Sequence, residues 1–305
     1  MKSLLGIGEC MIELSLTENK LWKQGFAGDV FNTLWYAKAL SKQDVIVNFY
    51  TATGDDKSSN EMIEFITGAG ISCQDIPIIT NGVPGLYKIH LDGAERSFSY
   101  WRDTSAAKLM MSNPELLWKQ VSQADIVYLS GITLAILPKE DVNTLLQELR
   151  SALKKSAIVA FDPNIRPALW DSESRMKEII SSAGAISDLV LPSFDDEKNT
   201  FGDQSPLETA KRYHSLGADQ IIVKNSDQDT LYSTKSVTQY YPVNKVSGIV
   251  DTTAAGDSFN GAYLAELLNS GDCSKAIELA HLCSSTVICN KGALIPFETV
   301  QASVR

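Results

Sequence analysis

The sequence predicts an α/β fold in which helices cover both faces of a mainly parallel central sheet, with a small β-sheet lid inserted into it. From residue 126 onward, short apolar runs alternate regularly with helical patterns, which is typical of parallel sheets with crossover helices. Between Gly85 and Trp101 the apolar pattern instead has a period of two residues, which indicates hairpin strands. No internal repeat or linker is visible, so residues 1–305 are expected to form one domain.

The N-terminal region carries strand and helix signals in turn. Leu4 to Leu14 is an apolar, partly alternating run and is predicted as the first core strand. Asp29 to Leu40 has the apolar spacing of a helix, with an acidic residue near its start. Val45 to Thr53 is predicted as a buried strand, and Lys57 to Gly70 as a helix that a glycine ends.

A hairpin is predicted from Leu86 to Trp101, with its turn at Asp92-Gly93. Apolar and aromatic residues stand on both alternating faces of this hairpin, so each face needs a surface to cover it. We expect the lid to combine two segments, around residues 11–24 and 84–102.

The rest of the chain continues the alternation. The expected strands are 126–130, 158–162, 189–191 and 220–224, the expected helices are 139–154, 172–183 and about 205–215, and a hairpin at 230–241 precedes two C-terminal helices.

Composition excludes several classes of function. The formal net charge of −10 lacks the basic footprint that non-specific nucleic-acid binding needs, although a few arginines can still attract an anionic substrate. No run approaches the roughly 18 apolar residues of a membrane span. The strand-like run that follows Met1 to Gly6 is too short for a signal peptide. The five cysteines are scattered, which indicates free thiols. We therefore expect a cytoplasmic protein that does not bind membranes.

The most informative stretch runs from Asp251 to Gly261 and leads into a helix. The first N–H groups of a helix lack internal partners and attract anions, and the small residues Ala254, Ala255 and Gly256 allow close approach to them. Asp257 is either a residue that caps the helix or a general base for a hydroxyl that attacks a phosphoryl group. The second reading predicts catalysis by residues 254–257.

This stretch, Asp-Thr-Thr-Ala-Ala-Gly-Asp-Ser-Phe, resembles the C-terminal signature of the ribokinase-like (PfkB) sugar kinases. Other segments resemble the 2-keto-3-deoxygluconate kinases of that family. They are Gly8-Glu9-Cys10-Met11-Ile12-Glu13, Pro84-Gly85-Leu86-Tyr87, Ser99-Tyr100-Trp101-Arg102, Leu129-Ser130-Gly131-Ile132 and the run from Phe161 to Trp170. The resemblance spans Ile7 to Pro296 and implies a ribokinase-like fold with a β lid.

The resemblance implies a sugar pocket. In the family a Gly-Gly-Asp-x-x-Asn pattern closes on the sugar, and it falls here on Gly28, Asp29 and Asn32, with Ala27 in place of the first glycine. Asp29 could instead be only a helix cap. Tyr87 and Tyr100 resemble sugar-contacting tyrosines of the family's lid, although packing within the lid would also explain them.

Two arginines indicate an acidic substrate. Arg102 leaves the predicted lid, and Arg166 follows Asn164 after a predicted core strand, so both can reach one cleft. A guanidinium offers paired donors that suit a carboxylate, which a neutral sugar lacks. Either arginine could instead be a surface ion-pair residue. Asn164, Arg166 and Arg102 are thus candidate substrate residues, together with Asp257.

No Gly-x-x-x-x-Gly-Lys-Ser/Thr motif is present, so a Walker-type loop is excluded. The resemblance implies that ATP binds near the loops after the late strands. This places Ser193, Lys224, Ser226, Gly256 and Asn290 as candidate nucleotide contacts. Mg²⁺ should accompany ATP and be held partly by water, with Glu197 as either a water-mediated ligand or an exposed helix residue. No metal site built from the protein alone is predicted.

Together with these residues, the resemblance implies an ATP-dependent kinase that phosphorylates the 6-hydroxyl of 2-keto-3-deoxygluconate. A kinase of a neutral ketose such as fructose, a nucleoside kinase and a catalytically silent sugar-acid-binding protein remain alternatives. In the resembled family the lids of two subunits commonly pack together, which implies a homodimer formed through the lid. Both faces of the lid could instead pack against the chain's own core.

Overall fold

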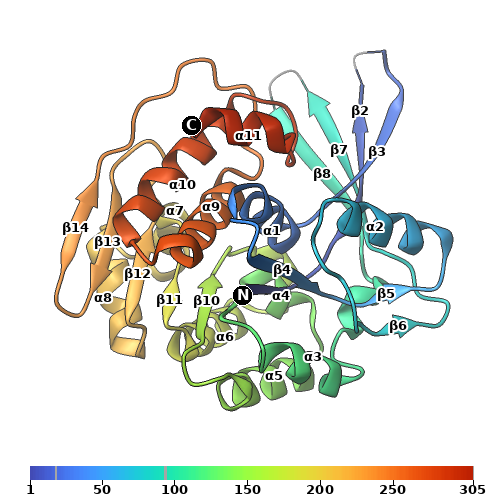
Figure 1. Cartoon of the computed structure of the whole chain (residues 1–305), viewed down its shortest axis with the longest axis horizontal. Helices are drawn as coiled ribbons and strands as arrows, with labels where there is room; N and C mark the ends of the chain where they lie inside the picture. The colour runs from blue at the N-terminus through green and yellow to red at the C-terminus, as the bar shows by residue number, and fades with distance from the viewer. Residues whose placement is uncertain (18, 93–94, 305) are drawn as a thin grey trace.

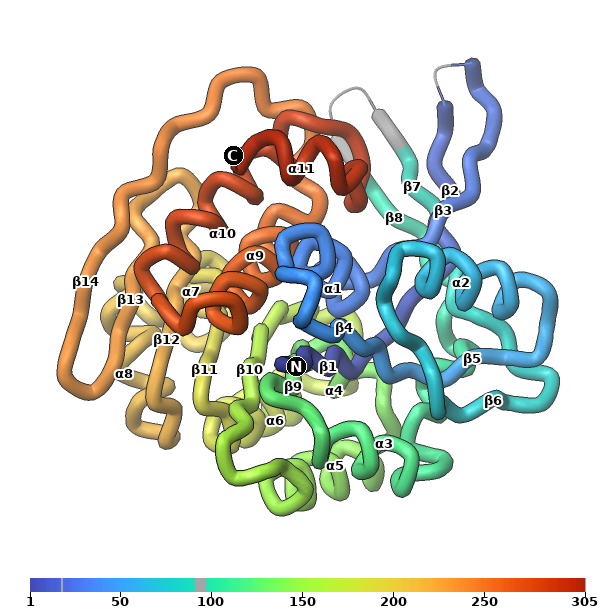
Figure 2. The backbone as a smooth tube through the Cα atoms, in the orientation of Figure 1, coloured from blue at the N-terminus to red at the C-terminus, as the bar shows by residue number. Residues whose placement is uncertain are grey.

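The computed structural model describes residues 1–17, 19–92 and 95–304, and a central sheet separates two layers of helices (Figures 1 and 2). The sheet has the strand order β14-β13-β12-β11-β10-β9-β1-β4. All neighbours from β4 to β12 are parallel, and β13 and β14 add an antiparallel edge. The strands are β1 (Lys2–Ile7), β4 (Val45–Tyr50), β9 (Ile126–Ser130), β10 (Ile158–Asp162), β11 (Leu189–Val190), β12 (Gln220–Val223), β13 (Thr230–Thr234) and β14 (Thr238–Tyr241).

Each face of the sheet has its own apolar core. Alternate residues of one strand enter opposite cores, as with Leu4 on one face and Leu5 on the other. The first core is covered by α1 (Asp29–Leu40), α2 (Lys57–Gly68), α9 (Ala255–Ser270), α10 (Cys273–Ile288) and α11 (Phe297–Ser303). The second core is covered by α3 (Pro114–Val121), α4 (Gly131–Ile136), α5 (Lys139–Ala152), α6 (Glu173–Ile186), α7 (Phe194–Phe201) and α8 (Pro206–Leu216). The predicted α/β/α layering is confirmed.

Local sequence signals explain where several helices begin and end. The side chains of Asp56, Ser172 and Ser205 accept hydrogen bonds from backbone N–H groups in the first turns of α2, α6 and α8. Gly202 and Gly271 take left-handed conformations at the ends of α7 and α9, where a side chain would be strained. The starts of α2, α6 and α8 match the predicted helices to within a few residues, whereas α7 was not predicted.

A second, four-stranded sheet forms the lid and lies to one side of the main body (Figure 1). It has the order β3-β2-β7-β8, with β2 (Met11–Leu16), β3 (Trp22–Ala27), β7 (Leu86–Asp92) and β8 (Glu95–Trp101). The predicted strand Leu4–Leu14 is wrong as one element, because the core strand ends at Ile7 and a lid strand begins at Met11. The predicted turn includes Gly93, which lies outside the described residues. A short pair, β5 (Thr53–Gly54) and β6 (Ile78–Ile79), completes the sheets.

The lid has two different faces. Tyr87 and Ile89 are buried on one face in a cluster that includes Ala293 of the main body. The opposite face packs at its base against α2, where the rings of Phe26 and Phe65 are 5.5 Å apart. Farther out it exposes Trp22 and Trp101, with 50% and 59% of their surfaces accessible.

Within the described chain, no helix combines the length and apolar character needed to cross a bilayer. All five cysteines are free.

Candidate active site

A cleft of about 1000 Å³ lies between the lid and the carboxyl ends of the parallel strands. Asp162 ends β10, Ser193 follows β11, and Lys224 follows β12, and all three line this cleft. Ligands of open α/β sheets bind at this edge, because the loops that leave parallel strands gather there. Tyr87 and Tyr100 of the lid line the opposite wall.

The first turn of α9 lies at the floor of the cleft. Ala254 precedes the helix in a left-handed conformation (φ 58°), and Ala255, Gly256 and Asp257 form its first turn. Asp251 fixes the preceding loop by accepting hydrogen bonds from the N–H groups of Thr253 (3.0 Å) and Gly292 (2.6 Å). The predicted loop-to-helix junction is confirmed, and its small residues border open space.

Asp257 is placed to act as a base. Its carboxylate accepts a hydrogen bond from the Asn32 side chain at 2.8 Å. Burial, and after it the nearby carboxylate of Asp29, raises the pKa of Asp257 to about 7, although Asn32 and Lys224 act in the opposite direction. A carboxyl group with a pKa near the working pH suits proton transfer.

The start of α1 positions the residues next to Asp257. Gly28 caps this helix, and a Cβ at Gly28 would lie 2.1 Å from the carbonyl oxygen of Glu9, so only glycine fits. Its N–H donates to Asn32 (3.3 Å), and Asp29 accepts a hydrogen bond from the Asn164 side chain at 2.9 Å. Asn164 has a positive φ of 33° and joins α1 to the loop after β10.

The two arginines both line the cleft, and each has a carboxylate partner. Arg102 donates to Glu9, and both side chains are largely buried. Arg166 lies 3.4 Å from Asp196 and also donates to the carbonyl of Ile165 (2.8 Å). Arg166 is the more exposed cation, with 51% of its side chain accessible against 10% for Arg102.

The lid tyrosines contact each other on the face toward the cleft. Their ring centroids are 6.0 Å apart, and the Tyr87 hydroxyl donates to Glu13 of the neighbouring strand. Tyr87 is buried, whereas 52% of Tyr100 is exposed to the cleft and solvent. Tyr100 is therefore the more accessible of the two to a ligand.

Four of the five candidate nucleotide residues line the other end of the cleft. Lys224 donates to Asp162 (2.9 Å) and Asn260 (3.1 Å), and Ser226 donates to Asp195 (2.8 Å). Asn290 is the exception, because it is not among the residues that line the cleft, and its side chain donates to the carbonyl of Thr286.

Sequence reasoning missed several acidic residues of the cleft. Glu9, Asp162, Asp195 and Asp196 all line it, although no role was assigned to them. Glu9 and Asp162 lie inside segments that resemble the sugar kinases, and Asp162 also ends a buried strand, which was the available signal. These carboxylates are hard oxygen donors, so the cleft suits Mg²⁺ brought by a polyphosphate.

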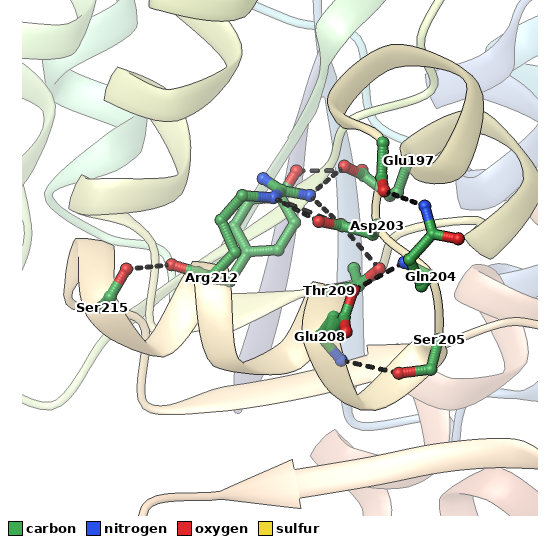
Figure 3. A network of polar contacts seen from close by, with 10 residues as sticks. Glu197, Asp203, Gln204, Ser205, Glu208, Thr209, Arg212 and Ser215 are labelled. Carbon is green, nitrogen blue, oxygen red and sulfur yellow. Dashed lines mark hydrogen bonds and ion pairs between the residues drawn. The ribbon is translucent and has the colours of Figure 1, made fainter.

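The structure contradicts both interpretations of Glu197, as a water-mediated Mg²⁺ ligand and as an exposed helix residue. It is neither exposed nor in the cleft, because its carboxylate is fully buried between α7, to which it belongs, and α8. Figure 3 shows Arg212 reaching both Glu197 and Asp203, and the Tyr213 hydroxyl also donates to Glu197 at 2.9 Å. Burial raises the pKa of Glu197 to about 7 despite these partners. Glu197 therefore joins α7 to α8 and does not bind metal.

Comparison with known proteins agrees with this geometry. The family model described as pfkB family carbohydrate kinase matches residues 1–300. The 2-dehydro-3-deoxygluconokinase of Dickeya dadantii is 38% identical, with 99% of each chain covered, and that of Haemophilus influenzae is 35% identical over 97% of this chain and 96% of its own.

The solved structures show the same fold. The crystal structure titled as a putative Ribokinase II in complex with ATP and Mg²⁺ from E. coli has a TM-score of 0.84 and 18% identity, covering 100% of this chain and 99% of its own. The match along nearly the whole sequence, together with a cleft that contains the expected signature, shows that this chain belongs to the pfkB family of carbohydrate kinases and is a sugar kinase.

Proposed function

We propose that this chain uses ATP and Mg²⁺ to phosphorylate the terminal 6-hydroxyl of 2-keto-3-deoxygluconate. The observation that carries this proposal is that Arg102 and Arg166 line the same cleft as Asp257. A sugar acid has a carboxylate at one end, which arginine recognises, and a hydroxyl at the other end, which a base can activate. The names of relatives that are 35–38% identical support the same substrate.

Arg166 is the better candidate to bind the carboxylate. Arg102 already has a buried partner in Glu9, whereas Arg166 is half exposed and its contact with Asp196 is long, at 3.4 Å. A substrate carboxylate can therefore bind Arg166 at little cost in broken contacts. Gly28, Asp29, Asn32, Asn164 and Tyr100 would then surround the sugar chain.

In the proposed reaction the 6-hydroxyl oxygen attacks the γ-phosphorus of ATP while Asp257 accepts the hydroxyl proton. A new O–P bond forms, and the bond between the γ-phosphorus and the bridging oxygen breaks, so ADP leaves with the electron pair. The N–H groups at the start of α9 stabilise the charge on the transferred phosphoryl group. Asn32 orients the Asp257 carboxylate through its 2.8 Å hydrogen bond.

The nucleotide would occupy the end of the cleft lined by Ser193, Lys224 and Ser226. Asp195 and Asp196, which line the cleft close to Ser193 in the sequence, would hold Mg²⁺, directly or through water. When bound, this ion would neutralise the charge of the phosphate oxygens. Seven carboxylate residues and only four lysine or arginine residues line the cleft, so an accompanying cation is expected to favour ATP binding.

The test is an ADP-release assay with 2-keto-3-deoxygluconate, fructose and a nucleoside. We expect turnover with the keto acid, and Arg166→Ala should raise its KM by about 10- to 150-fold, the equivalent of one charge-assisted hydrogen bond. Arg175→Ala is the control, because Arg175 is not among the residues that line the cleft and its guanidinium pairs with Glu178 of the same helix. Preference for fructose would favour the neutral-ketose alternative, and no ADP with any substrate would favour a silent binding protein.

We also propose that the protein is cytoplasmic and forms a homodimer through the outer face of the lid. Trp22 and Trp101 are exposed on this face, and buried aromatic residues commonly anchor interfaces. Ile89, by contrast, is buried on the face that meets the main body, so a charge there would test folding and not this interface. Sedimentation should show a dimer in the wild type and a monomer for Trp101→Asp. A monomeric wild type, or a variant that remains dimeric, would contradict this interface.

A further inference from the structure

Lys224 is held at the floor of the cleft by two buried side chains. Its ammonium group donates to Asp162 at 2.9 Å and to Asn260 at 3.1 Å. Asp162 is 4% exposed and Asn260 is fully buried, whereas 14% of the Lys224 side chain remains accessible from the cleft. The lysine therefore has a fixed position and one open side.

The supporting residues are themselves fixed. Asn260 donates to Asp162 at 2.6 Å and to the Tyr128 hydroxyl at 3.1 Å, and Asp162 accepts the N–H of Asn164 at 3.0 Å. The network thus connects α9, β9, β10 and the loop after β12. Long lysine side chains usually keep several rotamers, so these contacts offset a substantial entropy cost in advance of ligand binding.

The open side of Lys224 faces the start of α9. A Cβ built at Gly256 would lie 3.6 Å from the Lys224 ammonium nitrogen, which is its one described neighbour within 4 Å apart from the adjoining residues and the backbone of α9 itself. Gly256 needs neither a positive φ nor close packing, so the fold itself does not require glycine there. Gly256, Lys224 and Asp257 therefore border the same part of the cleft.

We propose that Lys224 is a catalytic residue that contacts the transferring phosphoryl group in this part of the cleft, with Asp162 and Asn260 as positioning residues. The proposal rests on the proposed kinase function and adds a fixed cation to it. The O–P bond to the sugar forms while the bond to ADP breaks. During this step the ammonium group stabilises the negative charge on the equatorial phosphoryl oxygens. Lys224 transfers no proton, because the hydroxyl proton goes to Asp257.

The first test compares Lys224→Met with Lys119→Met in steady-state assays. Lys119 forms an ion pair of 2.7 Å with Asp75 on the surface, so its loss controls for removal of a lysine. We expect Lys224→Met to lower kcat by about 10²- to 10³-fold, as for the loss of one preorganised donor, with a smaller change in the KM of the sugar. Ethylammonium should restore part of the activity of Lys224→Ala, which a purely structural role does not predict.

Asp162→Asn tests the positioning role through the pH profile. The charged groups that act on Asp257 are Asp29 from α1, Asp162 from β10 and Lys224, with neutral Tyr36 and Tyr128 behind them. Asp162 raises the pKa of Asp257, so loss of its charge should move the acid limb of the pH profile of kcat/KM to lower pH. Lys224 lowers that pKa, so loss of its charge should move the acid limb to higher pH. Shifts in the same direction, or none, would contradict this arrangement.

The two proposals can fail separately. The variants are assayed with whichever substrate the wild type phosphorylates best, so a wrong choice of sugar does not change the expectation for Lys224. A wild type with turnover and a Lys224→Met variant that keeps more than about a third of it would overturn the role of the lysine alone. A wild type that phosphorylates no substrate would overturn the proposed function and the catalytic lysine together.

Discussion

Replacing Gly256 with alanine should separate catalysis from folding. The added methyl group would lie 3.6 Å from the Lys224 ammonium, which is an ordinary contact distance. Gly256 is in the first turn of α9, where alanine is the better helix former. The free energy of unfolding should therefore stay unchanged or rise by up to about 1 kcal/mol.

The same methyl group should damage turnover. The methyl group would fill the space that we assign to the phosphoryl group. The phosphoryl group would then lie farther from the N–H groups of the first turn. Losing one such donor typically costs about 2.7 to 4 kcal/mol in the transition state, or about 10²- to 10³-fold in kcat. A protein that is as stable as the wild type but nearly inactive is the expected result.

The assays are urea unfolding and ADP release at saturating substrates, with two matched glycines as controls. Gly68→Ala adds a methyl group with no neighbour within 4 Å, so both stability and activity should be retained. Gly261→Ala would place Cβ 2.3 Å from the Thr33 carbonyl oxygen where α1 meets α9, so it should destabilise the fold by about 1 to 3 kcal/mol or more. Wild-type turnover in Gly256→Ala would refute the placement of the phosphoryl group next to Gly256. A loss of stability as large as that of Gly261→Ala would show that the fold itself requires this glycine.

Two further predictions use the buried carboxyl groups. Because the pKa of Asp257 is raised to about 7 and its carboxylate is the active form, kcat/KM should rise with pH through a midpoint near 7. Asp29→Asn removes a neighbouring negative charge and should lower that midpoint, and an unmoved midpoint would argue against Asp257 as the titrating group. Arg212→Ala leaves Glu197 buried without its cation and should cost about 3 to 5 kcal/mol in urea unfolding. A loss below about 1 kcal/mol would contradict the importance of this network.

The sequence predicted most of the core because local signals and burial agree there. Strands Ile126–Ser130 and Ile158–Asp162 and helix Asp29–Leu40 match the structure, since each combines a clear apolar pattern with polar or glycine boundaries. The split between β1 and β2 was missed because Met11 and Ile12 are buried at the base of the lid, so the apolar pattern continues past the core strand. Helices α3, α4 and α7 were not predicted, and the described chain has three C-terminal helices, α9, α10 and α11, where two were expected.

The site was predicted less completely because its electrostatics depend on distant partners. Arg102 and Glu9 are 93 residues apart, so no local pattern indicates that the arginine is already paired. Glu197 looked like a surface residue, but Arg212 and Tyr213 of a following helix allow its burial. Asp257 and the small residues before it were found because their signal is local, at one helix start.

The measurement that tests the central claim most directly is the turnover of Asp257→Asn with 2-keto-3-deoxygluconate at saturating ATP. The amide keeps the shape of the side chain and can still contact Asn32, but it cannot accept the hydroxyl proton. Calorimetry should show wild-type binding of the sugar acid and of ATP, while kcat falls by about 10²- to 10⁴-fold. A variant that binds both ligands and keeps more than about a third of wild-type turnover would show that Asp257 is not the base.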